Sequence, residues 1–136
     1  MNDKAENGNK AVPKFDWVTE RSACTLAKVF KEIELQVEED VKTRNGLRPP
    51  NSPYEFSVAE TIGEFTVMLK AKDVERSVTF SLSEHGILVR EDRGTPMLEV
   101  TLAFTDEGAC SLEVNGKRRE PWQVRRMALE ELFFRG

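Results

Sequence analysis

Apolar residues recur every three or four positions near the start of the chain, which is typical of one face of an α-helix. They are Leu26, Val29, Phe30, Ile33, Val37 and Val41. Asn45-Gly46 and the prolines that follow cannot continue a helix. We therefore predict one helix over roughly residues 17–44, with Asp16, Thr19 or Ser22 as its N-cap.

After the prolines, the pattern changes to an alternation of apolar and polar residues, which is typical of half-buried strands. The alternating segments are residues 54–60, 64–70, 77–83, 85–91, 97–104 and 109–114. Short turns rich in Gly, Asn and Asp separate them. The pattern predicts a six-stranded antiparallel meander with one apolar face and one polar face.

A second helix is expected at the C-terminus, because Glu120-Pro121 is a favourable helix start. Helical spacing places Trp122, Leu129 and Phe133 in one row, which predicts that Trp122 and Phe133 anchor the core. The expected fold is thus a two-layer α+β domain over residues 15–136, in the order α-β6-α. Both helices cover one face of the sheet, and residues 1–14 form a disordered leader.

Composition narrows the class of protein. The chain has 136 residues, a net charge of −4 and 32% charged residues, as in a soluble globular domain. An acidic total disfavours a dedicated nucleic-acid binder. Cys24 and Cys110 lie far apart in apolar patterns, so we expect both to be buried, reduced thiols in the cytoplasm. No apolar run approaches the ~18 residues of a membrane span.

Catalytic signals are missing from the sequence. The one histidine, His85, lies in an expected turn, and no serine or cysteine has the context of a nucleophile. The glycines form no phosphate-binding loop, and the acidic residues form no cluster of metal ligands. We therefore expect a protein that is not an enzyme and that has no cofactor and no metal.

Cations gather around the start of the C-terminal helix. Lys117, Arg118 and Arg119 are expected in the turn before it, and Arg125 and Arg126 within it. This end of a helix is unfavourable for positive charge. Either the acidic run Glu38-Glu39-Asp40 compensates the cations, or they are simply solvated, or an anionic partner binds them.

Met127 and Phe134 point away from the expected core stripe and share a face of the helix. A helix that is apolar on two sides usually contacts two surfaces. One surface would be the sheet, and the other is either the N-terminal helix or the same helix of a second copy. We favour the second copy and expect this strip to be the contact of a homodimer.

The function expected from these features is a non-catalytic protein-interaction module, adaptor-like, chaperone-like or immunity-like, that acts as a homodimer. One alternative is a small-ligand carrier with a pocket between sheet and helices, lined by Trp17, Tyr54 and Trp122. A further alternative is an anion or nucleic-acid binder that uses the Lys117–Arg126 cations. A closed core with an exposed apolar strip would favour the first, and an open internal cavity the second.

Overall fold

The computed structural model describes residues 16–71, 73–92 and 94–134. The leader expected at residues 1–14, and Phe15, lie outside these residues. The elements are α1 (Trp17–Ala23), α2 (Leu26–Gly46), β1 (Glu55–Thr61), β2 (Glu64–Ala71), β3 (Val74–Leu82), β4 (Ile87–Glu91), β5 (Thr95–Phe104), β6 (Cys110–Val114), β7 (Lys117–Arg119) and α3 (Pro121–Phe134).

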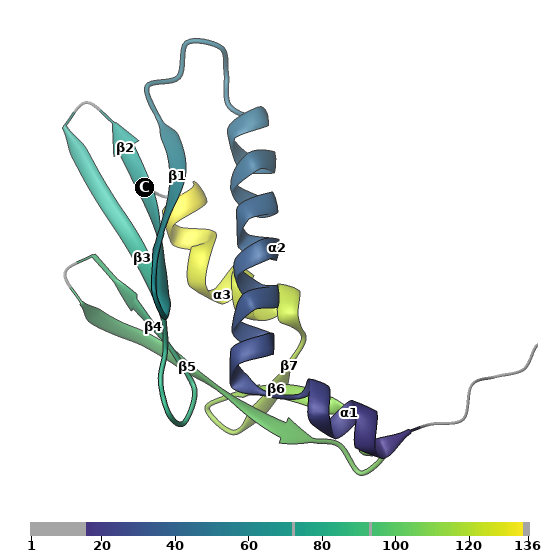
Figure 1. Cartoon of the computed structure of the whole chain (residues 1–136). Coiled ribbons are helices and arrows are strands. Elements are labelled where there is room, and N and C mark those ends of the chain that lie inside the picture. The colour runs from purple at the N-terminus through teal and green to yellow at the C-terminus, as the bar shows by residue number, and fades with distance from the viewer. Residues whose placement is uncertain (1–15, 72, 93, 135–136) are drawn as a thin grey trace, which may run out of the picture.

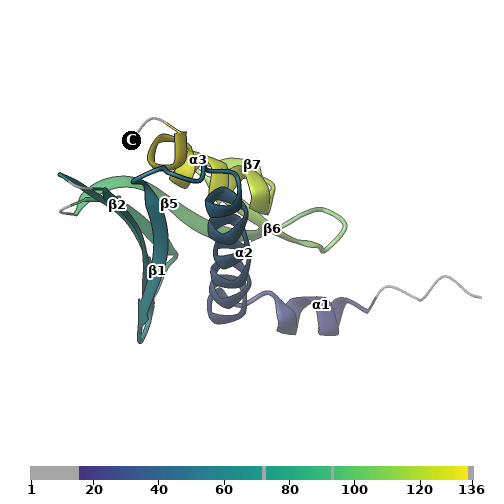
Figure 2. The ribbon, with the colours of Figure 1, turned by 90° about the horizontal axis from the view of Figure 1, so that it is seen from above.

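The predicted α+β fold with an antiparallel sheet is confirmed. The strands lie in the order β1 to β7, and each pairs only with its neighbours in the chain. Figure 1 shows α2 and α3 on the same side of this sheet, and Figure 2 shows that the sheet bends around them. The core therefore lies between one face of the sheet and the two long helices.

The sheet has seven strands rather than six. Asn115 and Gly116 both have positive φ, 54° and 77°, which favours a two-residue hairpin turn. This turn pairs Val114 with Lys117 and makes Lys117–Arg119 a strand. The expectation that these three cations lie in a turn was therefore wrong.

The N-terminal helical region is two helices rather than one. The side chain of Asp16 accepts hydrogen bonds from the amides of Val18 and Thr19 and caps α1. Thr25 has an extended backbone, and its hydroxyl accepts a bond of 3.2 Å from the amide of Lys28 at the start of α2. The break therefore falls at Cys24-Thr25, because Thr25 begins a new helix.

Cys24 and Cys110 form a disulfide, which contradicts the expectation of two reduced thiols. Their Cα atoms lie 5.5 Å apart, although the two residues are 86 positions apart in sequence. The bond joins the α1–α2 junction to the start of β6. Every residue of α1 is exposed, so this bond ties a helix with little buried surface of its own to the domain.

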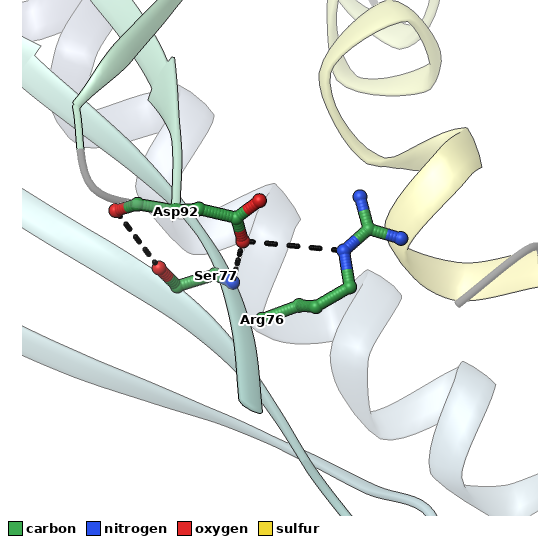
Figure 3. A network of polar contacts seen from close by, with 3 residues as sticks. All are labelled: Arg76, Ser77 and Asp92. Carbon is green, nitrogen blue, oxygen red and sulfur yellow. Dashed lines mark hydrogen bonds and ion pairs between the residues drawn. The ribbon is translucent and has the colours of Figure 1, made fainter. Parts of the chain in front are cut away.

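The turn after β4 is held by a polar network with β3 (Figure 3). Asp92 has φ of 50°, and its carboxylate accepts a bond of 3.1 Å from the amide of Ser77. The guanidinium of Arg76 lies 3.9 Å from the same carboxylate oxygen. These contacts favour the left-handed conformation of Asp92, so we assign the network a structural role.

Glu34 is the buried charged residue of the domain, at 4% exposed, within the part of the chain described. Burial, followed by the nearby carboxyl of Glu60 on β1, raises the pKa of Glu34. Lys31 opposes this effect from 3.4 Å. The environment of Glu34 therefore disfavours its ionised form relative to water.

Replacing both cysteines by alanine should lower the free energy of unfolding by about 2–4 kcal/mol, because the disulfide closes a long loop. Thermal and urea unfolding measure this change. A thiol reductant should lower the stability of the wild type and leave the double variant unaffected. Equal midpoints for both proteins would show that the bond does not stabilise the domain.

Glu34→Gln should stabilise the protein near pH 7 by the order of 1 kcal/mol, because a neutral amide avoids both the cost of burying a charge and the repulsion from Glu60. Because the pKa of Glu34 is raised, its contribution to the stability of the fold is fully present below the ordinary pKa of a glutamate. This contribution is lost as the pH rises through the raised pKa. The variant should therefore lack this decline when urea unfolding is followed as the pH is raised from below 4.5, the ordinary pKa of the group. Glu39→Gln, on the exposed face of α2, is the control and should retain it.

Candidate functional site

A surface groove of about 530 Å³ lies between the second half of α2 and α3. Its apolar lining is formed by Leu47, Trp122, Leu129, Phe133 and Phe134. The floor is fixed, because Leu129 and Phe133 are core residues that are 2% and 8% exposed. The groove is therefore built on the packed interior of the domain, and its shape follows from the docking of the two helices.

Three large apolar side chains of the groove are exposed to solvent. Leu47 is 71% exposed, Phe134 67% and Trp122 53%. Isolated exposed apolar residues are common, but apolar residues that gather around a groove indicate a contact surface. These three residues therefore make the groove the leading candidate site.

Two ion pairs shape the charge of the groove. Arg125 Nε lies 2.7 Å from Asp40 Oδ2, which joins α3 to α2. Arg126 Nε lies 2.6 Å from Glu130 Oε1, one turn later on α3. The hydrogen bond to Glu130 raises the pKa of the Arg126 guanidinium. The groove thus carries charges of both signs beside its apolar lining.

Arg44 closes one end of the groove. Its Nε donates a hydrogen bond of 2.8 Å to the carbonyl oxygen of Phe133, near the C-terminus of α3, where a cation is favourable. Its guanidinium lies 5.2 Å from the ring centroids of Phe56 and of Phe134. Arg44 therefore helps to hold the exposed Phe134 ring in place.

The structure divides the predicted basic cluster between β7 and α3, although Arg119 and Arg126 line one small hollow. Lys117, Arg118 and Arg119 lie on β7, where Arg118 is directly opposite Glu113 of β6. Arg125 is paired with Asp40, so the acidic run on α2 does compensate one of the cations. The cluster therefore offers a less concentrated positive surface than the sequence suggested.

Met127 and Phe134 lie two turns apart on the same exposed side of α3. Both are exposed, at 39% and 67%, but only Phe134 lines the α2–α3 groove. Met127 borders a smaller hollow of about 300 Å³ with Arg119 and Gln123. Part of the predicted strip thus belongs to the groove.

Trp17, Tyr54 and Trp122 do not form one pocket. Trp17 lies on α1, away from the α2–α3 groove (Figure 1), whereas Tyr54 lines a hollow of about 320 Å³ beside Phe56. Trp122 lines the groove and is half-exposed, so its expected role as a core anchor was wrong. Phe133 does pack in the core, 5.0 Å from the ring of Phe56.

Sequence analysis missed Leu47 and Arg44. Leu47 directly follows α2 and reads as the start of a proline-rich linker. The available signal was an apolar residue immediately after the helix-ending Gly46, a position that often packs against the helix. Arg44 gave no signal, because its partners lie in other elements of the fold. Phe133, for example, is 89 residues further along the chain.

The described residues contain no group of three or more His, Cys, Asp or Glu side chains that could hold a metal ion. None of the helices among them is long and apolar enough to span a membrane. In comparisons with known proteins, no family model, curated protein or solved structure matches this chain.

Proposed function

We propose that the protein is a non-catalytic protein-interaction module that works as a homodimer and uses the α2–α3 groove as its contact surface. The observation that carries this proposal is the exposure of Leu47, Trp122 and Phe134 around one groove. Large aromatic side chains in such positions are typical anchors of protein interfaces.

The groove is also suited to binding because its walls are already ordered. Val37 and Val41 of α2 and Leu129 and Leu132 of α3 are buried in the core beneath it. A surface held in this way loses little conformational freedom when a partner binds. The charges of Arg125, Arg126, Asp40 and Glu130 would then set the orientation of the partner rather than most of the affinity.

A small-ligand carrier is the second candidate, and the volume of the groove favours it, since 530 Å³ lies in the range of ligand sites. However, the groove is open to solvent, and the space between sheet and helices is filled by rings such as Phe65 and Phe80, both fully buried. An anion or nucleic-acid binder has less support, because Arg125 and Arg126 already pair with carboxylates.

The disulfide also bears on where the protein works, which the sequence led us to expect in the cytoplasm. That expectation depended partly on reduced cysteines, whereas disulfides persist mainly in oxidising compartments. We therefore propose that the protein works where the Cys24–Cys110 bond is maintained.

Leu47→Glu should remove the proposed contact, because it places a charge in the apolar lining. Native mass spectrometry of gently purified protein should show a second polypeptide bound to the wild type. In the variant, the bound fraction of that polypeptide should fall roughly tenfold. Ile62→Glu is the matched control, because Ile62 is also an exposed aliphatic residue but lies in the β1–β2 turn, outside the groove, so this variant should keep the partner.

Equal binding by the wild type and Leu47→Glu would exclude the groove as the contact. A fixed mass excess of a few hundred daltons, lost in Leu47→Glu, would instead favour the carrier.

A further inference from the structure

The exposed side of α3 carries a ridge of four residues spaced four positions apart: Trp122, Arg126, Glu130 and Phe134. Trp122 and Phe134 are 53% and 67% exposed. The side chains of Arg126 and Glu130, paired along the helix, are 65% and 37% exposed. Such i, i+4 rows are the ridges by which helices pack against one another.

The ridge lies between two hollows. On one side is the α2–α3 groove, which includes Leu129 and Phe133. On the other side is the smaller hollow beside Gln123 and Met127. A ridge flanked by grooves can pack against an equivalent ridge, because each then fits into the groove of the other.

The order of chemistry along the ridge is self-complementary in one orientation only. Read in either direction, the ridge is aromatic at both ends and charged in the middle, with the cation and the anion exchanged. In an antiparallel pair, Arg126 of one copy meets Glu130 of the other, and Trp122 meets Phe134. In a parallel pair, Arg126 would meet Arg126, and like charges in contact oppose association.

We infer that the occupant of the α2–α3 groove is a second copy of this chain, whose α3 docks antiparallel through the ridge Trp122, Arg126, Glu130 and Phe134. This inference rests on the proposed function and names its partner. The interface is isologous, so every contact occurs twice about a two-fold axis that passes between Arg126 and Glu130. Packing of two i, i+4 ridges sets the helices at about −50° to each other.

The existing Arg126–Glu130 pair is compatible with this arrangement. A carboxylate accepts several hydrogen bonds, and a guanidinium donates up to about five. The pair of each copy, with Nε to Oε1 at 2.6 Å, therefore becomes half of a ring of four alternating charges. The aromatic residues at either end shield this ring from water, as the rim of neutral contacts does in protein interfaces.

A charge-exchange experiment tests the orientation and the partner together. Sedimentation equilibrium of the purified wild type should show a dimer. Arg126→Glu alone and Glu130→Arg alone should each raise the dimer dissociation constant about 100-fold, because each places like charges together at two symmetric positions. An equimolar mixture of the two variants should recover dimers, since all facing charges are then opposite.

Circular dichroism shows whether each variant is folded. Recovery of dimers in the mixture would show that each substitution acts through its charge and does not simply damage the surface. Lys117→Glu, which changes a charge on β7 outside the ridge, should leave the dimer unchanged. A wild type that is still monomeric at a protein concentration about 100-fold above a micromolar dissociation constant would overturn the inference. So would a mixture of the two variants that stays monomeric while the wild type is dimeric.

These outcomes are separable from those of the proposed function. If the wild type is a monomer that binds a different protein, and Leu47→Glu loses that protein, the second copy is not the occupant of the groove. The interaction module would remain supported in that case. A dimer that survives Leu47→Glu and both charge reversals would contradict both proposals.

Discussion

The stacking of Phe65 on Phe80 is the contact on which the arrangement of the two layers depends. Their rings face each other across β2 and β3, with centroids 4.6 Å apart and planes within 12°. Phe30 of α2 packs onto this pair, 5.3 Å from Phe65. The aromatic cluster thus fixes where α2 crosses the sheet. The position of α2 in turn sets that of α3, through the Arg125–Asp40 pair and the Arg44 bond to Phe133.

The proposed contact surface follows from this arrangement. Two helices side by side on a bent sheet leave a furrow between them, and the residues beneath it must be apolar to complete the core. Side chains at the ends of the helices that point away from the sheet then have no core to enter, whereas Phe133, which points toward it, does. Leu47 at the end of α2, and Trp122 and Phe134 at the two ends of α3, remain at the surface for this reason. A site of this kind needs no loop or cofactor, only helix ends with apolar residues.

Much of the fold was predictable from the sequence, because periodicity reports local geometry directly. The alternation of Val78, Phe80 and Leu82 identifies β3, and the spacing from Val29 to Val41 identifies α2. The outward position of Trp122 was not predictable, although it shares a helical row with Leu129. Periodicity gives the direction of a side chain, but not how far along the helix the sheet reaches.

The disulfide and the groove needed information of a different kind. Cys24 and Cys110 are 86 residues apart and are brought together by the folded sheet and helices, and no spacing along the chain indicates their pairing. Similarly, Arg44 of α2 joins Phe56 of β1 to Phe133 and Phe134 of α3. Contacts between elements depend on the angle at which helices cross the sheet, which the pattern of residues leaves open.

The bond between Cys24 and Cys110 also divides the polypeptide topologically. It closes a covalent ring that contains α2 and β1 to β5, while β7 and α3 lie in the free arm beyond Cys110. A mechanical force applied between the two ends of the chain would therefore bypass the ring and extend only the arms. The helix that carries the proposed dimer ridge could be peeled from the sheet while the stacked Phe65–Phe80 layer stays inside a closed loop.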